Sequence, residues 1–400
     1  MSQSESIARF LLVRGCWWLA IVVICWSVGC AKQYPSTFPL STYTRGELTG
    51  ETGPAAQVAF TLPAPIRAKV DETLDNAFPA PWTWASSAEL DVKQKQLLHG
   101  QQLYQQHCVH CHGLAGGGDG PTAASLVPRP RDFRRGVFKW KSTASRAKPT
   151  HADLVAILRD GALGTSMPPF GLMSADKLDA LADYVVYLSK RGEIERQLLI
   201  VYSQEGSSQE ELTANKETLS AEDQEELIEL LGETAEEQKE VIDESWETAE
   251  DAVVEAADPQ EVGVSMSGSG EEFEASVVRG RDIYLGSNAG CTKCHGTDGR
   301  GVAKLSGADA MDLWGMPNPP RNLTLGLWRG GRQPIDLYRR IHEGIAGSSM
   351  PGQGSNPKVS KKDIWDLVNF LRVLPSRPEL LPTGDGASPS VVSAVGSAGE

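Results

Sequence analysis

Two short stretches decide the fold, CVHCH at residues 108–112 and CTKCH at residues 291–295. Both have the pattern Cys-x-x-Cys-His, which is typical of covalent haem c attachment. In this pattern the two cysteines form thioethers with the haem vinyl groups, and the histidine lies beneath the iron. Two copies in one chain argue against a chance match and predict two covalently bound haem groups. The six attachment residues are Cys108, Cys111, His112, Cys291, Cys294 and His295.

The sequence around the two motifs is also repeated. GQQLY at residues 100–104 matches GRDIY at 280–284, and GTSMPP around Met167 matches GSSMPG around Met350. Each methionine lies 59 residues after the first cysteine of its motif. A thioether sulfur suits iron and raises the reduction potential of the haem. We therefore expect Met167 and Met350 to be the axial ligands opposite the motif histidines.

Other readings of these residues are weaker. Structural zinc needs four ligands in one place, and each motif offers only two cysteines and a histidine. Methionines without a counterpart at the repeat offset are the alternative ligands, namely Met173 in the first unit and Met311 or Met316 in the second. The remaining histidines, which we expect to be surface or packing residues, are His99, His107, His110, His151 and His342.

Each repeat unit resembles a class I c-type cytochrome domain, a small all-helical fold, over about 100 residues. The resemblance implies that the motif cysteines bind haem, that His112 and His295 are proximal ligands, and that Met167 and Met350 are distal ligands. Members of this family often use a proline carbonyl to accept the proximal histidine N–H. The candidates here are Pro128 or Pro130 and Pro319 or Pro320, and the arginines that follow, Arg131 and Arg321, are candidates to pair with haem propionates.

The predicted fold class is mainly α, with two tandem class I cytochrome c domains joined by an acidic, helical insert. Helical periodicity and composition divide the chain as follows: a signal or lipoprotein segment at 1–30, a Pro-rich tether at 31–88, domain 1 at 89–192, an acidic helical linker at 193–270, domain 2 at 271–376 and a disordered tail at 377–400. A short helix at residues 66–77, or an extended strap on domain 1, is the expected structure within the tether.

Negative charge is concentrated in the insert. Residues 205–261 hold 21 acidic and two basic residues, whereas the net charge of the whole chain is −14, so the remainder is mildly basic. This balance argues against nucleic-acid binding. Leu231, Ile242 and Trp246 lie on one helical stripe, which predicts that the insert packs on a domain or a partner. The alternatives for its acidic side are a solvated spacer and a docking face for a basic partner.

The N-terminus has the features of an export signal. Arg9 and Arg14 flank an apolar run at residues 15–28, shorter than the roughly 20 residues of a membrane-spanning helix. Residues 27–30 resemble a bacterial lipoprotein cleavage site, with Cys30 as the lipidated residue, although Ser27 departs from the usual aliphatic residue. An uncleaved anchor helix is the alternative. Either reading predicts an exported protein on the periplasmic side of a bacterial membrane.

These features favour a membrane-attached dihaem electron carrier of a respiratory chain, not an enzyme. The expected partners are redox proteins: a quinol-oxidising complex or dehydrogenase as donor, and a haem-copper oxidase or soluble cytochrome as acceptor. A dihaem peroxidase or a thiosulfate-oxidising cytochrome would need an open haem, which two matched methionines disfavour. A fixed cytochrome subunit of an oxidase or reductase is a further alternative.

Overall fold

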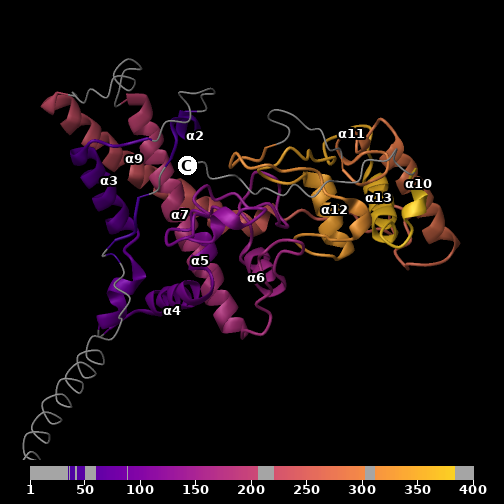
Figure 1. Cartoon of the computed structure of the whole chain (residues 1–400), viewed down its shortest axis with the longest axis horizontal. Coiled ribbons are helices and arrows are strands. Elements are labelled where there is room, and N and C mark those ends of the chain that lie inside the picture. The colour runs from indigo at the N-terminus through magenta and orange to yellow at the C-terminus, as the bar shows by residue number, and fades with distance from the viewer. Residues whose placement is uncertain are drawn as a thin grey trace, which may run out of the picture. The chain divides into compact units, whose positions relative to one another are not determined.

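The computed structural model describes residues 35, 37–40, 43–49, 60–87, 89–205, 220–301 and 311–382 (Figure 1). This part of the chain is helical and contains isolated β-bridges but no strands. The predicted mainly α fold is therefore confirmed. No helix among the described residues is long and apolar enough to cross a bilayer. The predicted signal segment, with Cys30, lies outside the described residues.

Domain 1 is built on the crossing of two helices, α4 (Val92–His107) and α7 (Ala175–Glu205). Gly100 lies at the crossing, where a Cβ atom would be 2.0 Å from the carbonyl oxygen of Ala180. One turn later, Tyr104 meets Tyr184 edge to face at 5.2 Å. The short helices α5 (Val109–His112) and α6 (His151–Asp160) complete the domain.

Domain 2 repeats this architecture with α10 (Glu271–Leu285), α11 (Thr292–His295), α12 (Pro334–Glu343) and α13 (Lys361–Val373). At its helix crossing, a Cβ on Gly280 would be 2.0 Å from the carbonyl oxygen of Asp366, and Tyr284 meets Phe370 at 5.5 Å. The residues that the sequence repeat aligns thus occupy equivalent places. The sequence repeat therefore preserves the close helix crossing of each domain, because only a residue without a Cβ atom lets the two helices approach so closely.

Helix α7 continues beyond the expected end of domain 1 at residue 192, and the extension is covered by the N-terminal helices α2 (Arg45–Thr49) and α3 (Ala64–Ala77). The buried side chains of α3 are Ile66, Val70 and Leu74. Phe38 and Tyr43 are also buried. The described part of residues 38–86 is therefore a packed helical cover. The short helix expected at residues 66–77 is present as α3, and it packs on domain 1 instead of belonging to a free tether or an extended strap.

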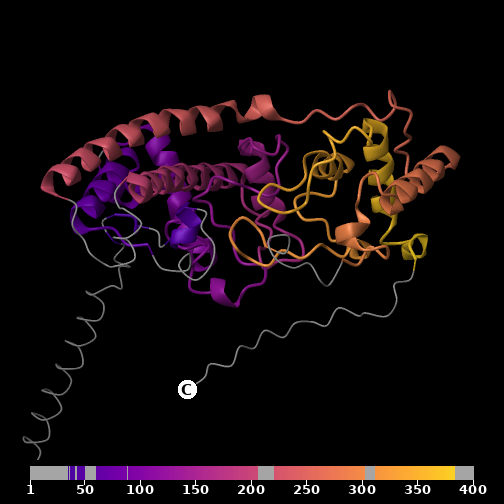
Figure 2. The same ribbon diagram turned by 90° about the horizontal axis from the view of Figure 1, so that it is seen from above.

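The acidic insert contains one long helix, α9 (Ala221–Glu247), which packs on α7 and α3. In Figure 2, α9 is the long pink helix beside α7. Ser220 caps it through a capping box with Asp223. Leu231, Ile242 and Trp246 are buried, so the predicted packing of the apolar stripe on a domain is confirmed. The helix ends at Glu247, within the expected acidic helical linker at 193–270, and passes into the 3-10 turn η4 (Thr248–Ala252).

The segment after η4 is hydrogen-bonded to both domains. Val254 N–H donates to the carbonyl of Ser142 in domain 1, at 2.9 Å. The carbonyl of Val254 accepts from Arg339 Nε in domain 2, at 3.1 Å. At the other end of domain 2, the 3-10 turn η7 (Pro378–Leu380) is followed by Leu381, which is buried. The first residues of the predicted disordered tail are therefore ordered.

Candidate haem sites

Both Cys-x-x-Cys-His motifs form the same tight helical turn, in α5 and α11 (Figure 1). The N–H of His112 donates to the carbonyl of Cys108 at 2.9 Å, and His295 donates to Cys291 at the same distance. This turn brings both sulfurs and the imidazole of a motif onto one short stretch. None of the four cysteines is in a disulfide.

The turn is clamped to the helix that precedes it. Tyr104 Oη donates to the carbonyl of Gly113 at 2.8 Å, and Tyr284 Oη donates to the carbonyl of Gly296 at 2.7 Å. These two glycines have φ of 75° and 73°, a region that favours glycine. The tyrosines that end the repeated segments GQQLY and GRDIY therefore hold the end of each motif.

Each motif histidine is oriented by a backbone carbonyl. His112 Nδ1–H donates to the carbonyl of Arg131 at 2.9 Å, and His295 Nδ1–H donates to the carbonyl of Arg321 at 3.2 Å. The expected proline carbonyls are not the acceptors, and the acceptor is one residue later than Pro130 and Pro320. The carbonyls of those two prolines face Gly118 and Gly301 instead, at 2.6 and 2.7 Å from the place of a Cβ.

The protonation state of these groups suits a metal ligand. Burial lowers the pKa of His112 and of His295, so both rings are neutral near pH 7. Because Nδ1 carries the proton, the lone pair of Nε2 is available to iron. Burial also raises the pKa of Cys108 to about 12 and that of Cys291 to about 11, which disfavours the thiolate form that a zinc site would need.

Met167 and Met350 lie on loops with the same hydrogen-bond pattern. The carbonyl of Met167 accepts from Ala162 N–H and that of Met350 accepts from Ile345 N–H, both at 3.2 Å. The N–H of each methionine donates to a hydroxyl two residues earlier, on Thr165 at 3.1 Å and on Ser348 at 3.3 Å. Two loops with one backbone shape present the two half-buried methionines in the same way.

The alternative methionines have no such equivalence. Met173 packs on the core of domain 1, Met311 is 44% exposed, and Met316 closes a turn with Asp312. Of the remaining histidines, His151 pairs with Asp183 and His342 with Glu343. Within the described ranges, no three His, Cys, Asp or Glu side chains converge as a separate metal site would require. The donors of the two motifs and the two methionine loops therefore fit covalently attached haem better than zinc.

A set of cationic side chains that the sequence did not bring together lies between the two domains. Arg131 and Lys139 come from domain 1, and Arg321 and Arg329 come from domain 2. Arg329 Nη2 donates to the carbonyl of Gly164, three residues before Met167, at 3.0 Å. Only Arg131 and Arg321 were candidates from sequence, because residues far apart in the chain give no local signal of such a cluster.

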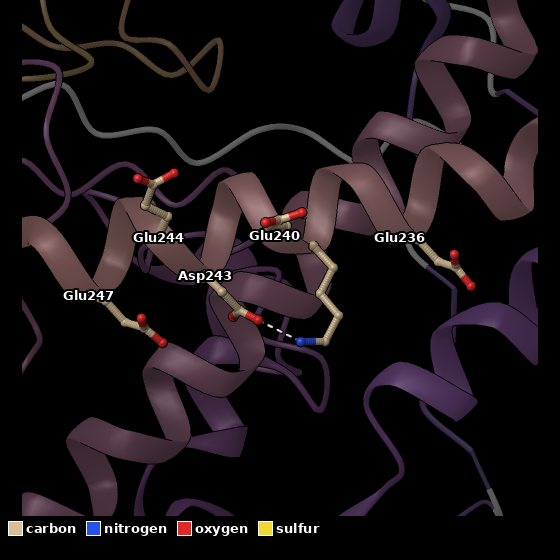
Figure 3. A pocket seen from close by; sticks show the side chains of 6 residues that line it. Glu236, Glu240, Asp243, Glu244 and Glu247 are labelled. Carbon is tan, nitrogen blue, oxygen red and sulfur yellow. Dashed lines mark hydrogen bonds and ion pairs between the residues drawn. The ribbon is translucent and has the colours of Figure 1, made fainter.

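An acidic pocket of about 550 Å³ lies elsewhere, along the outer side of α9 (Figure 3). Its lining residues are Glu236, Lys239, Glu240, Asp243, Glu244 and Glu247. Lys239 pairs with Asp243, which also pairs with Lys190 of α7 at 2.7 Å. This surface has no group that could attach haem, and docking of a basic partner there stays a prediction.

Comparison with protein families identifies both repeat units. Residues 95–185 match the family model "Cytochrome C oxidase, cbb3-type, subunit III", and residues 277–375 match the model "Cytochrome c". No curated protein matches the chain. A solved structure from Kuenenia stuttgartiensis, described as "reducing HAO-like protein complex Kustc0457/Kustc0458", is 24% identical with a TM-score of 0.47. The match covers 69% of this chain and 95% of that one.

Proposed function

We propose, from the premise that the chain carries two cytochrome c domains in tandem, that it is a dihaem electron carrier with one His/Met-ligated haem in each domain. Cytochrome c domains perform haem-based electron transfer, which is the general function of this protein. The observation that carries the finer proposal is the duplication of both ligand-bearing elements. The main hydrogen bonds of the motif turns recur in both domains, from the histidine N–H to the carbonyl of the first cysteine, and so do those between the methionine carbonyl and the N–H five residues earlier.

The cysteines and the histidines of the two motifs would have different roles in binding each haem. Cys108 and Cys111 would attach the first haem and Cys291 and Cys294 the second, with His112 and His295 as proximal ligands. Bound haem supplies an iron that gains and loses one electron. The neutral imidazole, fixed by its carbonyl partner, needs no reorientation when the iron charge changes. The thioether sulfurs of Met167 and Met350 would be the second protein ligands of the two irons, and a thioether ligand would favour the reduced state.

The matched methionine loops disfavour an enzymatic function. A peroxidase-like or thiosulfate-oxidising cytochrome needs an iron with an open or exchangeable position. Met167 and Met350 lie in loops of one shape, so neither domain has a distinct structure that would leave its haem open. A fixed subunit of a larger redox complex remains compatible with this ligation, because it differs from a shuttle only in its partner.

The location and partners belong to the same proposal. The export features of residues 1–30 support a protein attached at the periplasmic side of a bacterial membrane, through lipid on Cys30 or through an uncleaved helix. The partners would then be redox proteins of a respiratory chain, such as a quinol-oxidising complex or dehydrogenase as donor and a haem-copper oxidase or soluble cytochrome as acceptor.

Haem counting and ligand replacement test the proposal. Pyridine haemochrome analysis of the purified protein should give two haem c per chain, and the double variant Cys108→Ala, Cys291→Ala should lose haem stain on a denaturing gel. Met167→Ala and Met350→Ala should each make one haem bind carbon monoxide and lower its potential. An unchanged spectrum in either methionine variant would show that this methionine is not the ligand.

A further inference from the structure

Each domain contributes an arginine from its candidate haem site that contacts a residue of the other domain. The backbone carbonyl of Arg321 holds His295 in domain 2, while its Nη2 is 3.0 Å from the place of a Cβ on Gly164, in the Met167 loop of domain 1. Arg131 shows the reverse relation. Its carbonyl holds His112 in domain 1, and its guanidinium lies 3.6 Å from the ring centroid of Trp314 in domain 2.

Trp314 connects Arg131 to the second methionine loop. Its ring is 2.6 Å from the place of a Cβ on Gly347, three residues before Met350, and the neighbouring Leu313 N–H donates to the Gly347 carbonyl at 2.9 Å. Each proximal-side arginine therefore reaches the methionine side of the other domain. The two sites adjoin at one interface.

This interface contains more positive than negative charge. Its cations are Arg131, Lys139, Arg321 and Arg329, which we call the interdomain cation cluster. Lys139 bonds to Asp312 at 2.9 Å, and Asp312 is the carboxylate within the described residues that faces the cluster directly. The other nearby carboxylate, Asp132, is paired with Arg134 at 2.8 Å. Burial lowers the pKa of all four cations, and that of Arg131 and of Arg329 falls to about 10.

Three buried donors in the same region also need acceptors. Arg321 Nε, Arg329 Nε and Trp314 Nε1 have no hydrogen-bond partner among the residues that the structure describes. A buried donor without an acceptor, and a buried cation without a counterion, are both costly to a folded protein. The region therefore calls for an additional anion with several acceptor oxygens.

We infer that the interdomain cation cluster and Trp314 bind the propionate carboxylates of both haems, and that this shared site couples the reduction potentials of the two haems. The inference rests on the proposed function, since it takes the presence of two haems as given. Carboxylates match the planar donor fork of arginine, and haem c carries two of them. Because one cluster serves both haems, removal of a single cation should be sensed in both domains.

The test measures the midpoint potential of each haem in Arg321→Gln and Arg329→Gln, following the haem methyl resonances of each domain separately by paramagnetic NMR. Loss of one cation should disfavour the reduced state. The equilibrium constant for reduction should therefore fall by about threefold or more at both haems. Arg329→Lys, which keeps the charge, should recover most of the shift. Arg281→Gln is the matched control, because Arg281 pairs with the adjacent Asp282 at the surface.

Trp314→Phe, which keeps an aromatic ring but removes the indole N–H together with the pyrrole part of the ring, should shift the propionate bending bands in resonance Raman spectra. Two results would overturn the inference. One is a shift confined to a single haem, or no shift, in variants that retain two low-spin haems. The other is a dependence of the wild-type potentials on added phosphate at constant ionic strength, which would show that the cluster binds a diffusible anion. Fewer than two haems in the wild-type protein would instead refute the proposed function.

Discussion

A methyl group added at the helix crossing of either domain should destabilise the protein, whereas the same change on α9 should stabilise it. The Cβ of Gly100→Ala would lie 2.0 Å from the carbonyl oxygen of Ala180, and Gly280→Ala would meet Asp366 at the same distance. Ordinary contacts begin near 3.4 Å. The helices must therefore separate by about 1.4 Å, the difference between these two distances.

The magnitude follows from two opposing effects. Overpacking a core costs roughly 1–3 kcal/mol, and the upper part of this range applies because the obstacle is backbone. Replacing a helical glycine by alanine contributes about 0.5–1 kcal/mol in the other direction. The net loss in the free energy of unfolding should be about 2 kcal/mol for each crossing variant.

Gly232→Ala is the matched control, because a Cβ at that position of α9 has no atom within 4 Å. It should gain about 0.5–1 kcal/mol from helix propensity alone. Guanidinium denaturation of the three holoprotein variants, followed by far-ultraviolet and Soret circular dichroism, measures both signs. A Gly100→Ala or Gly280→Ala protein as stable as Gly232→Ala would refute the close crossing.

Four further substitutions test other parts of the structure. Leu231→Ala on α9 empties a fully buried site, so the free energy of unfolding should fall by roughly 2–5 kcal/mol in the same denaturation experiment. Tyr104→Phe and Tyr284→Phe remove the hydroxyl that clamps each motif, and each should cost about 1 kcal/mol with both haems still attached. The pKa of His151 is raised, chiefly by its hydrogen bond to Asp183. The resulting stabilisation should be fully present below the unfolded pKa of about 6.5 and disappear as the pH rises through the folded value. Melting temperatures of wild type and His151→Gln at pH 5.5 and 8.5 should then differ only at the lower pH.

The local chemistry of the sites was predictable because it depends on residues close together in the chain. Cysteine and histidine in one turn, and a methionine between two glycines and a proline, have the same neighbours wherever the domain is placed. The acceptor of the histidine N–H was less predictable. It lies 19 residues after His112 but 26 after His295, and loop geometry decided in favour of Arg131 and Arg321 over the adjacent prolines.

The length of α7 was missed for a different reason. Lys190, Arg191 and Gly192 have the composition of a helix end. In the fold, Arg191 is buried and donates to Glu195 one turn later at 2.7 Å, while Gly192 lies against the backbone of Arg134. Charged residues that become buried by pairing with each other look like surface residues in a sequence. The packing of the proline-rich cover on α7 was also hard to predict, because contacts such as that of Phe78 with Tyr187 at 5.3 Å join residues far apart in the chain.

The two hydrogen bonds of Val254 should affect the kinetics of electron exchange between the domains. Its N–H is used by one domain and its carbonyl by the other, so a rotation of one domain against the other would break at least one of these two bonds. Because Val254 holds both domains, the distance between the electron-transfer sites of the two domains should vary only within a narrow range. Electron exchange between the two domains should therefore follow a single exponential whose rate is independent of solvent viscosity.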